Sequence, residues 1–182
     1  MAGVRPLEWL LPQAAPRGEL DWEAVYREEM PRVFNFFRYR VADRATAEDL
    51  TSLTFEKAWR ARDRYRRDRA RTATWLLAIA RNVARDHFRK SRPEVPIGEG
   101  EAASHDSPEA AVLRQDDFAR LSALLDELPE RNRGLLALKY GAGATNRAIA
   151  KLTGLSESNV GTILHRVVTA LRSRWEEIGG KP

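Results

Sequence analysis

Cysteine is absent from this sequence of 182 residues, and its absence excludes several kinds of chemistry. The chain can form no disulfide, no thiolate metal site and no cysteine nucleophile. The three histidines, His87, His105 and His165, are scattered without the spacing of a metal site or a catalytic pair. The sequence also has no glycine-rich phosphate loop and no paired-carboxylate motif. We therefore expect a protein that is not an enzyme, uses no metal or other cofactor and takes no small-molecule substrate.

Long hydrophobic runs are absent as well. The apolar cluster near the start, residues 7–11, lies between Pro6 and Pro12. It is too short for the core of a signal peptide or for a membrane span. We expect a cytoplasmic protein without direct membrane insertion, in which residues 1–20 form a disordered N-terminal extension.

The sequence also lacks β-strand patterns, because no run alternates β-branched and polar residues. Apolar residues recur instead at helical spacing, which predicts an all-α protein. Three helices are expected in the first half, over residues 21–39, 46–62 and 73–89. Pro31 is expected to kink or split the first helix. The second begins at Thr46, where the order Thr-Ala-Glu-Asp resembles a capping box.

Charge is distributed unevenly around a formal net charge of +5. Residues 60–92 contain eleven Arg and one Lys against three Asp, a local balance of 12 − 3 = +9. Residues 94–117 contain seven acids against one Arg, a local balance of 1 − 7 = −6. We therefore expect a flexible acidic linker over residues 93–115. It would join two small helical domains, residues 21–92 and residues 116–178.

The second domain is expected to contain a helix-turn-helix. A helix through residues 118–125 and another through residues 135–138 precede it, and Gly141 and Gly143 close the second of these. Residues 146–165 then carry small and apolar residues at the spacing of two crossing helices. This pattern predicts a DNA-binding unit.

Four positions meet the steric requirements of a helix-turn-helix. Ala150 is small enough for two helices to cross closely, and Gly154 tolerates the positive φ of a tight turn. Val160 and Ile163 anchor the second helix to the first. The opposite face is polar and would meet base edges in a major groove, although an ordinary helical hairpin remains the alternative. The residues of that face are Ser156, Glu157, Ser158, Asn159, Gly161, Thr162 and His165.

The third predicted helix carries a cationic stripe. Arg81, Arg85 and Arg89 are spaced four residues apart, so they share one helix face that suits a phosphate backbone. Asn82 and Asp86 flank the stripe and could hydrogen-bond an exposed base. The alternative is a solvated helix face. Five further Arg in the preceding connection favour nucleic acid.

Two sets of motifs follow one another along the chain. The first comprises Glu48-Asp49-Leu50-Thr51-Ser52, Phe55, Trp59, Trp75-Leu76, Ile79-Ala80, Arg81-Asn82, Asp86 and Arg89. The second comprises Leu128-Pro129-Glu130-Arg131, Ile149-Ala150, Gly154, Val160, Leu164-His165-Arg166 and Leu171. Together they resemble regions two and four of the extracytoplasmic-function (ECF) sigma factors of the sigma-70 family. The resemblance covers roughly residues 22–90 and 118–174.

The resemblance implies an RNA polymerase sigma factor that delivers core polymerase to promoters. Its partners would be the clamp of the largest polymerase subunit, the flap of the second, promoter DNA and an anti-sigma factor. The candidates for clamp binding are Asp49, Leu50, Phe55 and Trp59. The alternative for Phe55 and Trp59 is a place in the hydrophobic core. Leu53 stands where the family usually has an acid.

The same resemblance assigns two DNA elements to the two domains. The Arg-rich connection and third helix would open the minus-ten element and hold a flipped base, and the helix-turn-helix would read the minus-thirty-five element. The minus-ten candidates are Arg67, Arg71, Trp75, Arg81, Asn82, Arg85, Asp86 and Arg89. The minus-thirty-five candidates are Ser156, Glu157, Ser158, Asn159, Thr162, His165 and Arg166. Ala148, Gly161 and Ile163 replace residues that are usually charged in the family. The acidic linker would thread the polymerase cleft, or act only as a tether.

Two other functions are weighed against this hypothesis. A stand-alone helix-turn-helix regulator would bind DNA without polymerase, but it would leave the block at residues 48–59 without a purpose. A sigma mimic would bind an anti-sigma protein and never touch DNA. The arginines and Asn82 of the third helix disfavour the mimic.

Overall fold

The computed structural model describes residues 21–66, 70–90 and 120–178. Over these residues the regular structure is helical and contains no strand, so the predicted all-α fold is confirmed. The expectations for residues 1–20, for Arg67 and for the acidic linker lie outside the described residues. The first half contains α1 (Trp22–Arg38), α2 (Arg44–Ala61), the short η2 (Arg62–Arg64) and α3 (Thr72–Lys90).

α1 runs without interruption from Trp22 to Arg38, so of the kink or split expected at Pro31, the split is wrong. Asp21 caps its N-terminus by accepting a hydrogen bond from the Ala24 amide at 3.1 Å. Val33, Phe36 and Phe37 are fully buried after the proline. Packing of this face against α2 and α3 offsets the backbone hydrogen bond that Pro31 removes.

α2 begins two residues before the predicted Thr46, because its N-cap is Asp43. The Asp43 carboxylate accepts hydrogen bonds from the Thr46 amide at 2.7 Å and from the Thr46 hydroxyl at 2.6 Å. Thr46 is therefore the residue that is capped and not the cap. Asp is as good an N-cap as Ser or Thr, and here it lies at the point where the chain leaves its extended conformation.

Two threonines enter the core on the inner face of α2. The hydroxyl of Thr51 donates to the Ala47 carbonyl at 2.7 Å, and that of Thr54 donates to the Leu50 carbonyl at 2.8 Å. These bonds satisfy the hydroxyl donors inside the helix, so both side chains can be buried at little cost. α3 packs across α1 and α2 and completes the first three-helix unit.

The second half begins with helical residues 120–126 and continues with α5 (Glu130–Leu136). After Leu136 α5 widens into a π-helical turn, η3 (Ala137–Gly141), and this continuous helical segment ends at Gly141 as expected. Gly143 follows with a φ of 64°, a left-handed backbone conformation that glycine adopts without strain. α6 (Asn146–Thr153) and the long α7 (Glu157–Glu177) complete the chain.

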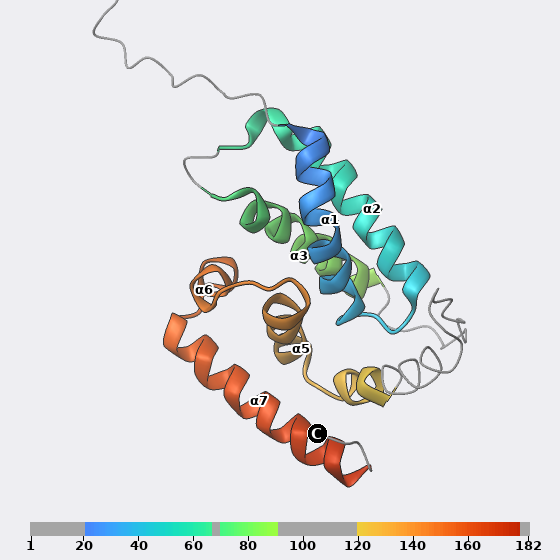
Figure 1. Cartoon of the computed structure of the whole chain (residues 1–182), viewed down its shortest axis with the longest axis vertical. Helices are drawn as coiled ribbons and strands as arrows, with labels where there is room; N and C mark the ends of the chain where they lie inside the picture. Colours follow the sequence, from blue (N-terminus) through green and yellow to red (C-terminus); the bar gives the residue numbers. More distant parts are fainter. Residues whose placement is uncertain (1–20, 67–69, 91–119, 179–182) are drawn as a thin grey trace, which may run out of the picture.

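The two halves lie against each other. η3 packs on α1, α6 contacts α3, and α5 lies between the first half and α7 (Figure 1). Buried apolar residues of both halves form one continuous cluster, in which Phe36 and Phe37 of α1 join Leu135 and Leu138 of the second half. The described part of the chain is therefore arranged as two helical units that share an interface.

Candidate nucleic-acid interfaces

The helix-turn-helix has the geometry that its sequence predicts. Gly154 ends α6 with a φ of 77°, and its amide donates to the Ala150 carbonyl at 2.9 Å. A Cβ at Gly154 would meet no atom within 4 Å, so this glycine is required by its backbone angle and not by lack of space. Ser156 then caps α7 by accepting from the Asn159 amide at 3.2 Å. The turn thus ends one helix and starts the next within three residues.

The packing between α6 and α7 depends on a small apolar contact. Ile149 and Val160 are fully buried, Leu164 is 5% exposed, and Ile163 and Ala150 are partly buried. A Cβ at Gly161 would lie 3.6 Å from the Asn146 side chain, which is ordinary van der Waals distance. An alanine methyl would therefore fit at Gly161 without a clash.

The outer face of α7 is open to solvent. All seven of the minus-thirty-five candidates are exposed. The Thr162 hydroxyl donates to the Ser158 carbonyl at 3.1 Å, which orients it and leaves its lone pairs outward. Asn, Ser, Thr and Arg side chains in this position can hydrogen-bond base edges. The residues are Ser156, Glu157, Ser158, Asn159, Thr162, His165 and Arg166.

The cationic stripe on α3 is less uniform than its spacing suggests. Arg81 is half-buried, and burial is the main cause that lowers its pKa, with the nearby charge of Arg85 adding to it. Arg85 is exposed. Arg89 is also exposed and forms an ion pair with Asp86 at 3.2 Å. Charge repulsion along this face would fall if phosphates bound to it.

Asp86 lies between two cations and Asn82 does not. The Asp86 carboxylate is 3.2 Å from the Arg89 guanidinium and 3.9 Å from the Lys57 ammonium of α2. Asn82 is exposed on the same helix. Asn82 can therefore offer its amide to a base, whereas Asp86 serves to hold the flanking cations in position.

Tyr65 is a residue of this surface that the sequence analysis missed. Its ring packs on Trp75 with centroids 4.6 Å apart and planes at 32°. Its hydroxyl donates to the Ala70 carbonyl at 2.8 Å and lies 3.1 Å from the Thr72 hydroxyl. Tyr65 thus joins the two ends of the Arg-rich connection to the start of α3. An isolated aromatic residue in a polar, Arg-rich stretch was the available signal. Of the remaining candidates here, Arg71 is exposed and Trp75 is partly buried.

The four clamp candidates on α2 separate into two pairs. Leu50 and Phe55 are 6% and 5% exposed, so they belong to the core and support the face from beneath. Asp49 is exposed, and Trp59 is 44% exposed. Only Asp49 and Trp59 offer side-chain surface to a partner. The alternative that Phe55 is a core residue agrees with its burial.

An aromatic ridge flanks this face. Trp59 packs edge-to-face on Trp22 at 5.4 Å, and the Arg62 guanidinium lies 3.9 Å from the centre of the Trp59 ring. Tyr26 packs on Phe55 at 4.8 Å and is 49% exposed. Tyr26 therefore adds partly exposed aromatic surface beside the buried Phe55 ring.

Known proteins match both halves of the chain. The model for Sigma-70 region 2 matches residues 25–94, and that for Sigma-70, region 4 matches residues 118–171. The RNA polymerase sigma-H factor of Pseudomonas aeruginosa is 33% identical over 146 residues, which cover 74% of this chain and 69% of that protein. The chain belongs to the sigma-70 family.

Within that family the sigma factor belongs to the ECF group. ECF RNA polymerase sigma factor BldN of Streptomyces coelicolor is 31% identical over 166 residues, which cover 88% of this chain. The matched part is 63% of the length of BldN. The fold is similar to that of the sigma factor RpoE in complex with the anti-sigma factor NepR from Bartonella quintana. Their TM-score is 0.66 at 21% identity, over 84% of this chain and 95% of that one.

Two expectations can now be compared with the findings, namely the absence of catalysis and the absence of a membrane span. Sigma factors are transcription initiation factors and not enzymes, which confirms the predicted absence of catalysis. No helix in the described ranges of the sigma factor is both long and apolar enough to cross a membrane. Among the described residues there is also no cluster of three or more potential metal-ligating side chains.

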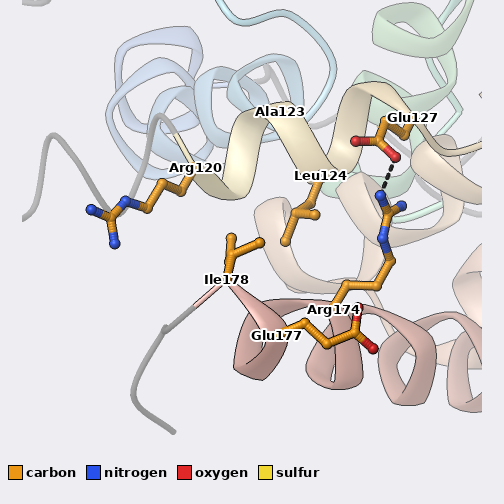
Figure 2. Close-up of a pocket in the computed structure, with 7 residues that line it drawn as sticks. All are labelled: Arg120, Ala123, Leu124, Glu127, Arg174, Glu177 and Ile178. Carbon is orange, nitrogen blue, oxygen red and sulfur yellow. Dashed lines mark hydrogen bonds and ion pairs between the residues drawn. The ribbon is translucent and has the colours of Figure 1, made fainter.

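A surface pocket of the sigma factor lies apart from all predicted site residues. It is formed between residues 120–127 and the C-terminal end of α7. Figure 2 shows the ion pair between Arg174 and Glu127 on one side of it, while Leu124 and Ile178 point into the space between the two helices. This pocket is lined only by residues of the second half, and none of them belongs to the candidate DNA surfaces.

Proposed function

We propose that this ECF sigma factor directs core RNA polymerase to promoters, recognises their minus-ten and minus-thirty-five elements and assists strand opening. In this proposal residues 21–92 act as region two, residues 116–178 act as region four, and residues 93–115 connect them. The observation that carries the proposal is the presence, in family order, of a cationic helix and a helix-turn-helix in one chain.

Reading of the minus-thirty-five duplex is assigned to the N-terminal part of α7. The exposed amide of Asn159 and hydroxyl of Thr162 would contact base edges, and Arg166 would contact phosphate or guanine. The N-terminal end of α7 adds the positive end of its dipole, which favours phosphate. Glu157 is repelled by phosphates unless it accepts a hydrogen bond from a cytosine amine.

Opening of the minus-ten element is assigned to α3 and the connection before it. Extruding one base costs on the order of a few kcal/mol. A bidentate base contact returns about 1 to 3 kcal/mol. Contacts from Asn82 and from the arginines could therefore offset one or two flipped bases, but not a melted duplex. Core polymerase must supply the remaining binding energy, so the free chain should bind promoters weakly.

Core polymerase binding is assigned to α2. Asp49 offers a carboxylate and Trp59 an exposed apolar surface, next to the half-exposed Tyr26. Trp and Tyr are enriched among interface hot spots. The partners would be the clamp of the largest subunit for α2 and the flap of the second subunit for region four. An anti-sigma factor in the cytoplasm would compete with them.

Run-off transcription with purified core polymerase on genomic fragments tests this function. Specific transcripts should appear only when the sigma factor is added. Tight promoter occupancy without core, and no stimulation of core, would establish a stand-alone regulator instead.

The double variant Arg81→Ala with Arg85→Ala separates a sigma factor from a sigma mimic. It should lose promoter-specific transcription while still binding core polymerase. Absence of promoter-specific transcription with the wild type as well would favour the mimic, whereas unchanged transcription with the variant would place the promoter contacts elsewhere. Arg172→Ala is the matched control, because Arg172 is an exposed cation near the C-terminal end of α7, outside both predicted DNA surfaces.

A further inference from the structure

The Asp86 carboxylate joins two helices of the first half, α2 and α3, which pack against each other (Figure 1). Its Oδ1 atom lies 3.2 Å from the Arg89 guanidinium on α3, and its Oδ2 atom lies 3.9 Å from the Lys57 ammonium on α2. Each carboxylate oxygen therefore faces one cation, and the two cations come from different helices. The sequence analysis assigned Asp86 and Arg89 to the DNA surface, but it assigned no role to Lys57.

Lys57 reaches across to α3 because its own helix offers it no acid. Side chains three and four residues apart meet on the surface of a helix. The residues at these distances from Lys57 are Leu53, Thr54, Arg60 and Ala61. None of them is acidic, so the carboxylate that attracts Lys57 is that of Asp86 on the neighbouring helix. Arg60, by contrast, pairs with Glu56 of α2 itself at 2.6 Å.

Lys57 and Trp59 lie on different sides of α2. Two residues along a helix turn the side chain by about 200°, so the two side chains point in nearly opposite directions. Trp59 packs on Trp22 of α1, and Lys57 extends toward Asp86 of α3. The aromatic surface assigned to polymerase binding and the ammonium group beside α3 are therefore separate features of one helix. Lys57 can contact a different partner from Trp59.

The two ion pairs of Asp86 add little to the stability of the fold. The side chains of Lys57, Asp86 and Arg89 are 44%, 37% and 72% exposed. Ion pairs between exposed side chains are screened by water and contribute little to folding. At 3.9 Å the Lys57 ammonium is beyond hydrogen-bonding distance of the carboxylate, so Asp86 attracts it without occupying its N–H donors. The arrangement thus orients two cations at the surface.

Lys57 offsets the carboxylate that interrupts the cationic stripe of α3. The three arginines of the stripe and Asp86 have a balance of 3 − 1 = +2, and Lys57 raises it to 4 − 1 = +3. Lysine binds phosphate as a compact point charge, and arginine binds it through a planar fork of donors. Both cations lie within 3.9 Å of one carboxylate, so a single phosphate beside that carboxylate can reach both.

Asp86 has two opposing effects on a phosphate at this place. Long cationic side chains lose rotamer freedom when a ligand fixes them, which weakens binding. A carboxylate that already holds both cations has caused part of this loss before DNA binds, so it strengthens binding. The same carboxylate repels the phosphate, but only weakly through water. The sign of the change in affinity on removing this charge therefore shows which effect dominates.

We propose that Lys57 and Arg89 together bind a backbone phosphate of the minus-ten strand that α3 is proposed to hold open, and that Asp86 is the positioning residue that holds both cations in place. This inference rests on the promoter function proposed above. It adds a residue of α2 to the DNA surface of region two, so α2 contacts polymerase on one side and DNA on another. Phosphate contacts carry no sequence information, so Lys57 serves every promoter of this sigma factor alike.

Binding of the holoenzyme to a promoter fragment with a mismatched, already open minus-ten region tests the Lys57 contact. Lys57→Gln should make the slope of log K against log salt shallower by about 0.7, the value for one phosphate on a single strand. At about 0.1 M salt this change corresponds to an affinity about fivefold lower. Lys57→Arg keeps the charge and should keep the slope. An unchanged slope in Lys57→Gln would overturn the contact.

A matched control and a second assay separate this contact from other roles of Lys57. Arg27→Gln is the control, because Arg27 is an exposed cation that pairs with Glu23 on α1, and it should leave the slope unchanged. Lys57→Gln should bind core polymerase as tightly as the wild type and melt at the same temperature. A loss of core affinity equal to the loss of promoter affinity would place Lys57 on the polymerase surface and overturn the proposal.

Asp86→Asn tests the positioning role. It should weaken binding to the open fragment about twofold to fivefold, although it removes a negative charge from the DNA surface. Asp86→Glu keeps the carboxylate and should recover part of this loss. The loss should be equal on fragments that differ in their minus-ten bases. Tighter binding of Asp86→Asn would show that repulsion dominates, and a loss confined to one base would make Asp86 a base contact. Either result would overturn the positioning role.

Run-off transcription with the wild type, in parallel, distinguishes failure of this site from failure of the promoter function. Promoter-specific transcription together with an unchanged salt slope in Lys57→Gln would remove only the phosphate site. Absence of promoter-specific transcription with the wild type would remove the proposed function, and the phosphate site with it.

Discussion

The two helices that are proposed to contact DNA, α3 and α7, differ in burial and in charge. α3 is a central helix of the first half, with five buried residues, and it presents arginines along one side. α7 lies at the edge of the second half, buries only Val160, Leu164 and Val167, and presents mostly uncharged polar groups at its N-terminal end. Charge supplies affinity for any phosphate backbone, whereas hydrogen-bonding groups discriminate between bases. On the proposed function, we expect α3 to bind the phosphate backbone and α7 to discriminate between base sequences.

The largest effect should follow from removing the support of α7. Ile149→Ala deletes a fully buried side chain at the contact between α6 and α7, so it should cost about 2 to 5 kcal/mol of unfolding free energy. Urea unfolding followed by circular dichroism measures the loss. Leu53→Ala, at a 37% exposed position, is the control and should change little. Equal losses from both variants would contradict the assigned packing.

Removing arginines from α3 should change the salt dependence of promoter binding. Arg81→Ala with Arg85→Ala deletes two phosphate contacts, so the slope of log K against log salt should become shallower by about 1.4 to 1.8. Binding of the holoenzyme to a promoter fragment between 50 and 200 mM salt, roughly the range over which this effect is large, measures it. A slope equal to that of the wild type would place the phosphate contacts elsewhere.

Removing a base-contacting side chain from α7 should change the sequence preference of binding instead. Asn159→Ala should cost about 1 to 3 kcal/mol on the preferred minus-thirty-five sequence and much less on a scrambled one. The salt slope should remain that of the wild type, because no charge is lost. Competition binding with the two sequences gives both quantities. An equal loss of affinity for both sequences in Asn159→Ala would contradict the assignment of base discrimination to α7.

The caps of the two halves should respond differently to acid. Hydrogen bonds from Thr46 are the main cause that lowers the pKa of Asp43 below 3.8, whereas Ser156, which caps α7, does not titrate. The Asp43 cap therefore stabilises α2 fully above pH 3.8 and is lost as pH falls through the lowered value. Asp43→Ala should cost about 1 kcal/mol near neutral pH. In chemical denaturation this cost should shrink toward zero below that value, and a cost independent of pH would argue against the cap.

The smallest effect is expected from removing the hydroxyl group that holds the Arg-rich connection in place. Tyr65→Phe keeps the ring on Trp75 and removes the hydroxyl that bonds Ala70, at a cost of roughly 0.5 to 1.5 kcal/mol. We expect slower strand opening, measured by permanganate footprinting of the minus-ten region, with unchanged affinity for core polymerase. Equal loss in both assays would indicate general destabilisation of the first half.

Local sequence patterns predicted much of this structure because they act within one or two turns of chain. Gly154 has the positive φ that its position in the motif predicts, and Val160 is buried as its spacing requires. The start of α2 was misplaced because Thr46 and Asp43 are both good caps, and only the direction of the incoming chain selects Asp43.

The sequence by itself determined the family, the helical fold and the polar face of α7, since each depends on residue types at short and fixed spacings. Only the tertiary structure decided which of these residues meet. It buried Phe55 beneath the face of α2, placed Tyr65 on Trp75, and brought Arg40 to Glu130 across 90 residues of sequence. Such contacts depend on how whole helices pack, and helix packing is set by the summed fit of many side chains that no local pattern contains.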